Sequence, residues 1–246
     1  MCGRYTLATS DSAQLRERFP IGESVEVRQR FNVAPGDDVL AATTDRDGNP
    51  CGELLRWGLV PSWSEGPGDR LKMINARVET VTQRPAFRRA LHRFRCLIIA
   101  DGFYEWQAVE APPVAASRLR SAKPVKRPFH ITRSDRRPFA FAGLWSIWRR
   151  EESVIRSCAI MTTAANPAVA PLHDRMPVIL DPAAEAAWLD PATPQPELLE
   201  LLAPLPVADT ALRPVGPAVN DARYDGPECL APPPLAHAAP AQPSLF

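Results

Sequence analysis

Short apolar segments at close spacing are the feature that most limits the folds open to this chain of 246 residues. They are rich in β-branched and aromatic residues, and few helical stretches separate them. Strands are expected over Arg4–Ala8, Val39–Thr43, Glu53–Val60, Cys96–Ala100, Gly102–Gln107, Pro128–Thr132, Pro138–Leu144 and Val154–Thr162. Such a succession favours an α+β fold with a mainly antiparallel, curved or barrel-like sheet and peripheral helices.

Helical patterns are fewer and fall between these strands. Helices are expected over Ser10–Phe19 and Pro85–Arg95, and after Asp181 and Pro196. In the first helix, Leu15 and Phe19 share the inward face. In the second, apolar residues face one side and arginines the other, and the segment leads directly into a strand. Phe31–Gly36 is expected to form a turn.

The expected domain covers residues 1–230, and two segments of the chain lie outside its sheet. Residues 111–127 are rich in Pro, Ala, Ser and basic residues, which is typical of a flexible, positively charged loop between strands. Residues 231–246 are dominated by Pro and Ala and are expected to be a disordered tail.

Hydropathy and cysteine usage exclude several classes of protein. The longest apolar run, Cys96–Ala100, is far shorter than a membrane span, and the start of the chain lacks the features of a secretory signal. We therefore expect a cytoplasmic protein with no membrane partner. The cysteines are odd in number, widely spaced and without a Cys-x-x-Cys pair, which argues against a disulfide framework or a zinc site.

Positive charge is concentrated in one part of a chain whose net charge is only +1. Between Arg70 and Arg95 there are eight basic residues and a single acid, Glu79. A local basic face is what a polyanion site needs, because phosphate contacts gain affinity through counterion release. The same charges are equally typical of a solvated helix face over Pro85–Arg95.

Cys2 carries distinctive chemistry if Met1 is removed, because its thiol then lies beside a free α-amine. Such an aminothiol condenses with an aldehyde through nitrogen to an imine and closes through sulfur to a five-membered thiazolidine. The two groups have ordinary pKa values of about 8.5 and about 7.7–8.0, so a neutral amine is accessible near pH 7. The alternative is that Cys2 is an ordinary residue of the first strand.

Four short segments together resemble the SRAP family, whose members form covalent complexes with abasic DNA. The segments are Met1–Arg4, Ile74–Thr80, Ala100–Trp106 and Leu172–Pro177. The resemblance extends from Met1 to about Pro232. It implies an SRAP-like fold, a role in the DNA damage and SOS responses, and single-stranded DNA with abasic sites as the partner. It also implies that Cys2 is the nucleophile that traps the aldehyde of the ring-opened sugar.

Glu105 matches the family's acid/base residue. Sugar opening, loss of water and ring closure all need proton transfers within hydrogen-bond reach. The flanking Tyr104 and Trp106 are expected to raise the pKa of the Glu105 carboxyl and so let it exchange protons near neutrality. The alternative for Glu105 is a strand carboxylate paired with an arginine.

His173 and Asn75 match two further residues of the family's site. The resemblance implies that His173 is the second proton-transfer group and assists sugar opening. It implies that Asn75 orients the nucleophile and the sugar, as an uncharged side chain that both donates and accepts hydrogen bonds. Alone, His173 is more typical of a structural hydrogen bond, and Asn75 of a turn cap.

DNA binding is expected from three arginines and two tryptophans. Arg4, Arg77 and Arg175 each follow a site residue by two positions, which puts both side chains on one face of extended chain. Their guanidinium groups would hold phosphates. Trp63 and Trp106 would stack on bases beside the lesion, although aromatic residues of a β-rich protein are more often core. Some relatives have a second aromatic after Trp63, where this chain has a serine.

Two other assignments of function stay open. A cysteine-type peptidase would use the same Cys2 nucleophile, and the family was first proposed to be peptidases. A non-covalent DNA-binding module would form salt-sensitive complexes that denaturant dissolves. For the abasic-site function, strand cleavage by a lyase step, reversal of the crosslink and autoproteolytic loss of Met1 are further expectations. No cofactor is required, and we expect a monomer associated with the bacterial nucleoid.

The end of the chain has a pattern of its own. The last five residues are Gln-Pro-Ser-Leu-Phe, which resembles the Gln-x-Ser/Asp-Leu-Phe peptides with which bacterial proteins dock on the replicative sliding clamp. A disordered linker that ends in Leu245 and Phe246 suits insertion into an apolar pocket, with Gln242 as the polar contact. The alternative is an apolar terminus packed against the domain.

Overall fold

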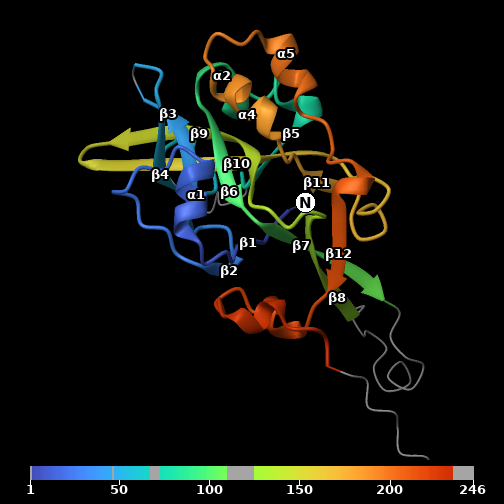
Figure 1. The fold of residues 1–246 in the computed structure, drawn as a ribbon. Helices are drawn as coiled ribbons and strands as arrows, with labels where there is room; N and C mark the ends of the chain where they lie inside the picture. Colours follow the sequence, from blue (N-terminus) through green and yellow to red (C-terminus); the bar gives the residue numbers. More distant parts are fainter. Residues whose placement is uncertain (1, 46, 67–72, 110–124, 235–246) are drawn as a thin grey trace, which may run out of the picture.

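The structure is a computed structural model, and it describes residues 2–45, 47–66, 73–109 and 125–234. Its strands form a five-stranded sheet in the order β12-β8-β7-β1-β2 and a seven-stranded sheet in the order β11-β10-β4-β3-β6-β9 with β5 beside β10 (Figure 1). The strands are β1 (Tyr5–Leu7), β2 (Arg30–Val33), β3 (Asp38–Thr44), β4 (Pro50–Trp57), β5 (Asn75–Arg77), β6 (Arg95–Ala100), β7 (Gly102–Val109), β8 (Val125–Arg133), β9 (Phe139–Arg150), β10 (Ser153–Ala164), β11 (Arg175–Pro177) and β12 (Thr210–Pro214).

The larger sheet closes into a barrel, because β9 pairs with β10 as well as with β6. All its pairings are antiparallel except those of β10 with β4 and β5. Apolar side chains fill the interior, and the Tyr5 ring meets those of Trp57 and Phe141 edge-on at 5.3 and 5.6 Å between centroids. The expected α+β fold with a mainly antiparallel, barrel-like sheet is confirmed.

Helices cover the outside of the barrel. They are α1 (Ser12–Arg18), α2 (Pro85–Arg93), α4 (Pro182–Leu189) and α5 (Gln195–Glu200), with 3-10 turns at Val78–Thr80, Val207–Asp209, Pro217–Asn220 and Pro227–Leu230. Helices α2, α4 and α5 gather at one end (top of Figure 1), where α2 and α4 pack against β6 and β9. Leu15 and Phe19 are buried, as the helical spacing predicts. In the described ranges, none of the helices is long and apolar enough to cross a membrane.

The structure differs from the sequence-based expectations at several elements. Phe31–Gly36 is not simply a turn, since its first three residues belong to β2. The helix expected over Pro85–Arg95 ends at Arg93, because Arg95 begins the buried strand β6 and its guanidinium donates to main-chain oxygens of the surrounding elements. Strands β5, β11 and β12 have only three to five residues, too few for a periodic pattern.

The segments expected to be flexible fall largely outside the described residues. Of the loop expected over 111–127, residues 111–124 lie outside them, and the last three belong to β8. Of the tail expected over 231–246, residues 231–234 are described, and the Ala231 oxygen accepts a hydrogen bond from the Gly216 amide. The clamp-binding peptide 242–246 lies outside the described part of the chain.

Candidate active site

The chain brings Cys2, Asn75 and Glu105 together from three separate segments. Cys2 precedes β1, which pairs with β7, the strand that carries Glu105. Asn75 begins β5, and its Nδ2 donates a 2.8 Å hydrogen bond to the main-chain oxygen of Cys2. The other side-chain atom of this amide, Oδ1, is buried and has no hydrogen-bond partner among the described residues. Asn75 therefore holds the nucleophile's own residue and keeps one acceptor uncommitted.

Cys2 is fully buried, and its Sγ lies 3.8 Å from the Arg4 carbonyl oxygen. Burial raises the pKa of the Cys2 thiol well above its usual range, and the charge of Glu105 acts in the same direction. The sulfur is thus a neutral thiol at neutral pH. Its addition to an electrophile needs a neighbouring group that accepts the thiol proton.

Glu105 has the properties of such a group. Its residue is 4% exposed, and burial raises the pKa of its carboxyl to about 7. The cause differs from the one expected, because Tyr104 and Trp106 face the opposite side of β7, where Tyr104 donates a 2.8 Å hydrogen bond to the Phe31 oxygen. The barrel interior, not the flanking aromatic residues, removes the carboxyl from water.

His173 lies in the turn before β11, with its side chain one-third exposed. The Arg175 amide donates to its Nδ1 at 3.0 Å, and the same Nδ1 lies 2.8 Å from a carboxylate oxygen of Asp174. Burial lowers the pKa of His173, and the positive charge of the chain's N-terminal amine lowers it further. The charge of Asp174, the residue after His173, raises the pKa of Glu105 further, which indicates that this turn lies near the Glu105 carboxyl.

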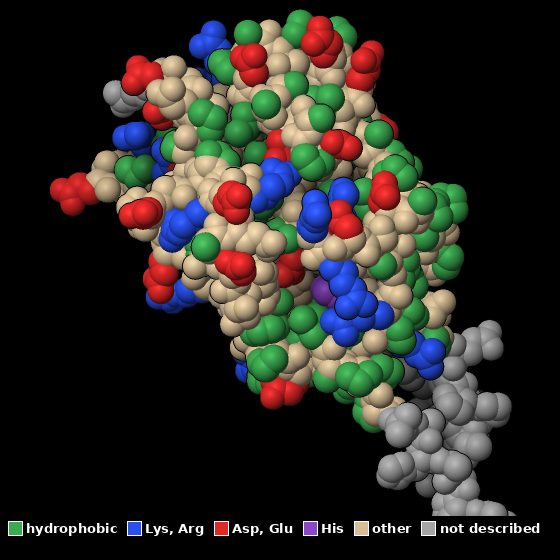
Figure 2. Space-filling view, viewed as in Figure 1, with side chains coloured by type: hydrophobic (Ala, Val, Ile, Leu, Met, Phe, Trp, Pro, Cys, Tyr) green, Lys and Arg blue, Asp and Glu red, His purple; other side chains and the backbone are tan. Residues whose placement is uncertain are grey.

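A groove opens beside Asn75, and its lining residues do not include Cys2, Glu105 or His173. Asn75 and Arg77 lie on one face of β5 and both line it, as the two-residue spacing predicts. The groove has a volume of about 510 Å³, and Trp63 forms part of its wall with 63% of its surface exposed. Trp63 is therefore not a core residue. On the face drawn in Figure 2, Lys and Arg side chains gather around a hollow that also holds a histidine.

Arg175 is already engaged within the protein. Its two terminal nitrogens lie 2.6 and 2.9 Å from the carboxylate oxygens of Glu79, and one of them also donates to the Thr162 oxygen at 2.6 Å. This pair lowers the pKa of the Glu79 carboxyl through the hydrogen bond from Arg175. Sequence reasoning did not assign Glu79 a role. Glu79 is the single acid in the basic stretch between Arg70 and Arg95, and this isolation is the sequence feature that could have indicated an ion pair.

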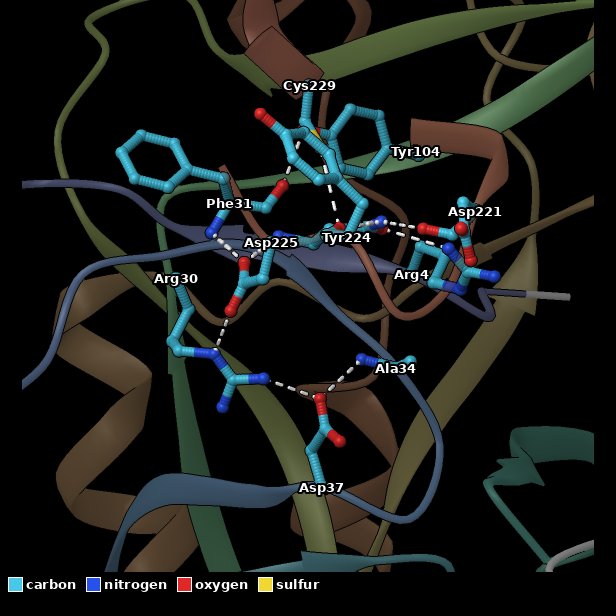
Figure 3. Close-up of polar contacts among 11 residues, drawn as sticks. Arg4, Arg30, Phe31, Ala34, Asp37, Tyr104, Asp221, Tyr224, Asp225 and Cys229 are labelled. Atoms are coloured by element: carbon cyan, nitrogen blue, oxygen red, sulfur yellow. Dashed lines mark hydrogen bonds and ion pairs between the residues drawn. The ribbon is translucent and has the colours of Figure 1, made fainter. Parts of the chain in front are cut away.

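Arg4 and Trp106 contact the C-terminal clasp, which we define as residues 217–231. Arg4 Nη1 donates to the Asn32 side-chain oxygen at 2.9 Å and to the Val219 oxygen at 3.0 Å. Trp106 Nε1 donates to the Asn220 side chain at 2.8 Å. Figure 3 shows Arg4 pointing toward the clasp, close to Asp221. Both side chains therefore have structural contacts in the protein without DNA.

The five cysteines are free thiols. Within the described ranges, His, Cys, Asp and Glu side chains form no cluster of three or more that could hold a metal ion.

The fold is α+β and is built on a barrel, and the site combines a cysteine, an asparagine, a glutamate and a histidine. Together these two features define the class of protein. The chain matches the model of the SOS response associated peptidase (SRAP) family over residues 1–222, and it belongs to that family. The resemblance inferred from the four short segments is thereby confirmed.

Curated relatives and solved structures agree with this membership. The chain is 38% identical to the abasic site processing protein YoaM of Bacillus subtilis, over 94% of this chain and 97% of the relative. It is 31% identical to the abasic site processing protein HMCES of Xenopus tropicalis, over 94% and 78%. A phage-related protein from Bordetella bronchiseptica has a similar structure, with a TM-score of 0.66, 32% identity and coverage of 87% and 94%. A Bacteroides thetaiotaomicron protein with 21% identity and a TM-score of 0.78, over 94% and 99%, shares the fold.

Proposed function

We propose that this protein processes abasic sites in single-stranded DNA by forming a covalent crosslink through Cys2. The observation that carries the proposal is the arrangement around Cys2: Asn75 holds its main chain, and a carboxyl with a pKa of about 7 lies buried beside it. A carboxyl of that pKa both accepts and returns protons near neutral pH. The curated relatives are named for abasic site processing, which supports the same substrate.

The chemistry begins with an aldehyde and an amine. After loss of Met1, by autoproteolysis or by an aminopeptidase, the Cys2 α-amine attacks the aldehyde carbon of the ring-opened sugar and forms a carbinolamine. Glu105 in its acid form protonates the hydroxyl, water leaves, and an imine results. The thiol then adds across the imine: a carbon–sulfur bond forms, and the thiol proton passes through the Glu105 carboxylate to the nitrogen. The product is a thiazolidine.

His173 and Asn75 support these steps. The Arg175 amide and Asp174 both lie against Nδ1 of His173, so Nε2 is the ring atom that would exchange a proton with the oxygen released when the sugar opens. Asn75 orients the Cys2 residue and offers its free Oδ1 to the amine or to the sugar. Loss of a β-proton from the imine would cleave the strand, and hydrolysis of the thiazolidine assisted by Glu105 would reverse the crosslink.

DNA would lie along the groove at β5. Arg77 is exposed there and would bind a phosphate, and Trp63 would stack on a base. Arg4, Arg175 and Trp106 remain proposed contacts that would first have to leave their partners in the protein. We further propose that the protein acts as a monomer on the nucleoid in the cytoplasm, without a cofactor, and that the peptide 242–246 docks it on the sliding clamp.

A peptidase activity is less well supported by the site. A cysteine peptidase attacks with a thiolate, whereas burial holds the Cys2 thiol in its neutral form. No observation in the described site favours a peptide substrate or a purely non-covalent role. Autoproteolytic removal of Met1 would be a peptidase reaction that agrees with the family's name and needs no peptide substrate.

Mass spectrometry of the purified protein mixed with an abasic oligonucleotide tests the proposal. We expect a heat-stable adduct with the wild-type protein, whose mass shows loss of Met1 and of one water. Cys2→Ala should form none, and Cys51→Ala, which alters a half-buried cysteine of β4, should form it normally. An adduct with Cys2→Ala, or native protein that retains Met1 throughout, would overturn the proposal.

A further inference from the structure

A second groove adjoins the active-site groove at Trp63. Trp63, Pro85 and Ala86 line both grooves, so they form the ridge that separates two parts of one continuous depression. The part beyond the ridge, here called the outer groove, has a volume of about 230 Å³. Its other main lining residues are Arg89, Phe94, Trp145, Ser146 and Arg149.

The loop that presents Trp63 is fixed to the barrel. Trp148 Nε1 donates to the Ser64 oxygen at 2.8 Å, and Arg150 donates to the Glu65 oxygen at 2.8 Å. The Ser64 hydroxyl closes the turn by donating to the Pro61 oxygen at 2.8 Å. The backbone that carries the 63% exposed Trp63 ring is therefore set before any ligand arrives, and this lowers the entropic cost of stacking a base on it.

The outer groove is basic. Arg89 comes from α2 and Arg149 from β9, and both are exposed. The guanidinium of Arg89 lies 5.7 Å from the centre of the Phe94 ring, which keeps it at the groove. The residues that line the outer groove include no acid. This combination attracts an anion and holds it next to aromatic surfaces.

The floor of the groove contains a donor without an acceptor. Trp145 is 6% exposed, and its ring is held edge-on by Phe94 at 5.1 Å and covered by Arg156 at 4.5 Å. Its indole Nε1 is buried with no hydrogen-bond partner in the described structure. A buried N–H that lacks an acceptor costs about 1–3 kcal/mol. A ligand that offers an acceptor to this N–H would recover that free energy on binding.

We infer that the outer groove is a second nucleotide subsite, which takes the base and phosphate of a nucleotide flanking the abasic site on the same strand. The base lies between Trp63 and the groove floor, with an acceptor on its edge for Trp145 Nε1, and the phosphate lies between Arg89 and Arg149. The volume is below the roughly 300–1,000 Å³ of pockets for drug-sized ligands, which suits one base. This inference rests on the proposed function, since the active-site groove must hold the lesion.

Binding of one-sided oligonucleotides tests the subsite. The probes carry a tetrahydrofuran analogue, which has no aldehyde, with nucleotides only on its 5′ side or only on its 3′ side, and affinity is measured by fluorescence anisotropy. We expect the wild-type protein to bind one of the two probes more tightly. The double variant Arg89→Gln/Arg149→Gln should lose about fivefold or more on that probe and little on the other. Arg93→Gln, an exposed change on the same helix that does not line the groove, should affect both probes equally and weakly.

A conservative variant separates a subsite from general charge. Trp145→Phe keeps an aromatic ring but removes the N–H together with the five-membered part of the indole, and we expect it to weaken the favoured probe alone. Equal losses on both probes for either variant would overturn the inference. Failure of the proposed function would appear differently, as absence of the adduct between wild-type protein and a true abasic strand, whatever the flanking sequence.

Discussion

The reaction centre and the C-terminal clasp both adjoin β1, and they treat their polar groups in opposite ways. Beside the clasp, Asn32 of β2 donates through Nδ2 to the oxygens of Asp221 and Tyr224 at 2.9 and 2.7 Å, and its Oδ1 accepts from Arg4. In the centre, Asn75 leaves Oδ1 without a partner. The polar groups at the clasp are hydrogen-bonded within the protein and stabilise the fold. The reaction centre keeps the Asn75 oxygen available for a substrate, at a cost in stability.

The largest effect is expected from a substitution of Asn32, the β2 residue that binds both the clasp and Arg4. Asn32 is 1% exposed, and Asn32→Ala removes one partner of the Arg4 guanidinium and the donor to two clasp carbonyls at once. We expect the free energy of unfolding to fall by about 4 kcal/mol. Urea denaturation followed by circular dichroism measures it. Asn49→Ala, in an exposed turn, should change it by less than about 0.5 kcal/mol.

An Asn32→Ala variant within about 1 kcal/mol of wild type would show that the clasp does not carry the stability assigned to it. Proteolysis adds a local measure, since release of the clasp exposes residues 217–231 to cleavage while the barrel stays folded. Cleavage confined to that segment is expected to precede global unfolding.

The barrel was predictable, but the way it assembles the site was not. Strands such as β6 and β9 are predicted from the sequence because of their apolar composition. Strands β5 and β11 have three residues each, and what makes them strands is pairing on either side of Thr162 in β10. The site residues Asn75 and His173 were accordingly placed by the family's motifs and not by periodicity.

Electrostatic partners were the other part that sequence could not supply. The pair between Arg175 and Glu79 joins residues 96 positions apart, and Arg4 reaches Val219 across 215 positions. Residue spacing predicts which side chains share a face of one strand or helix, and it does not predict contacts between distant segments. For Glu105, the expected rise in pKa agrees with the structure, but the flanking residues are not its cause, because alternation along β7 turns Tyr104 and Trp106 away.

The second prediction tests the cost of the reaction centre. The pKa of the Glu105 carboxyl is about 7 in the folded protein and near 4.5 when unfolded, so the folded state holds more protons between these values. The free energy of unfolding of wild type therefore falls as pH rises from about 4.5 to 7. Glu105→Gln removes this dependence, and we expect it to be more stable than wild type at pH 8 by roughly 2–3 kcal/mol at most.

The same variant should gain nothing at pH 4, where the carboxyl is protonated in both states, and it should slow both formation and reversal of the crosslink. Thermal denaturation at the two pH values, with gel-based crosslinking at pH 7, measures both effects. A variant that is no more stable at pH 8 than at pH 4 relative to wild type would mean that Glu105 is not strained by burial. Unchanged crosslinking kinetics would remove its acid/base role.

The smallest expected effect separates the arginines of the two regions. Arg77 lines the groove and is exposed, whereas the Arg4 guanidinium is bound to Asn32 and to the Val219 oxygen. For binding to a tetrahydrofuran-containing single strand, Arg77→Gln should reduce the slope of log affinity against log salt concentration by about 0.7, the value for one phosphate contact. Arg4→Gln should reduce the slope by less, because Arg4 has to leave Asn32 and the Val219 oxygen before it can bind a phosphate. An equal reduction for Arg4→Gln would show that DNA draws Arg4 out of the clasp, and would merge the two regions into one binding surface.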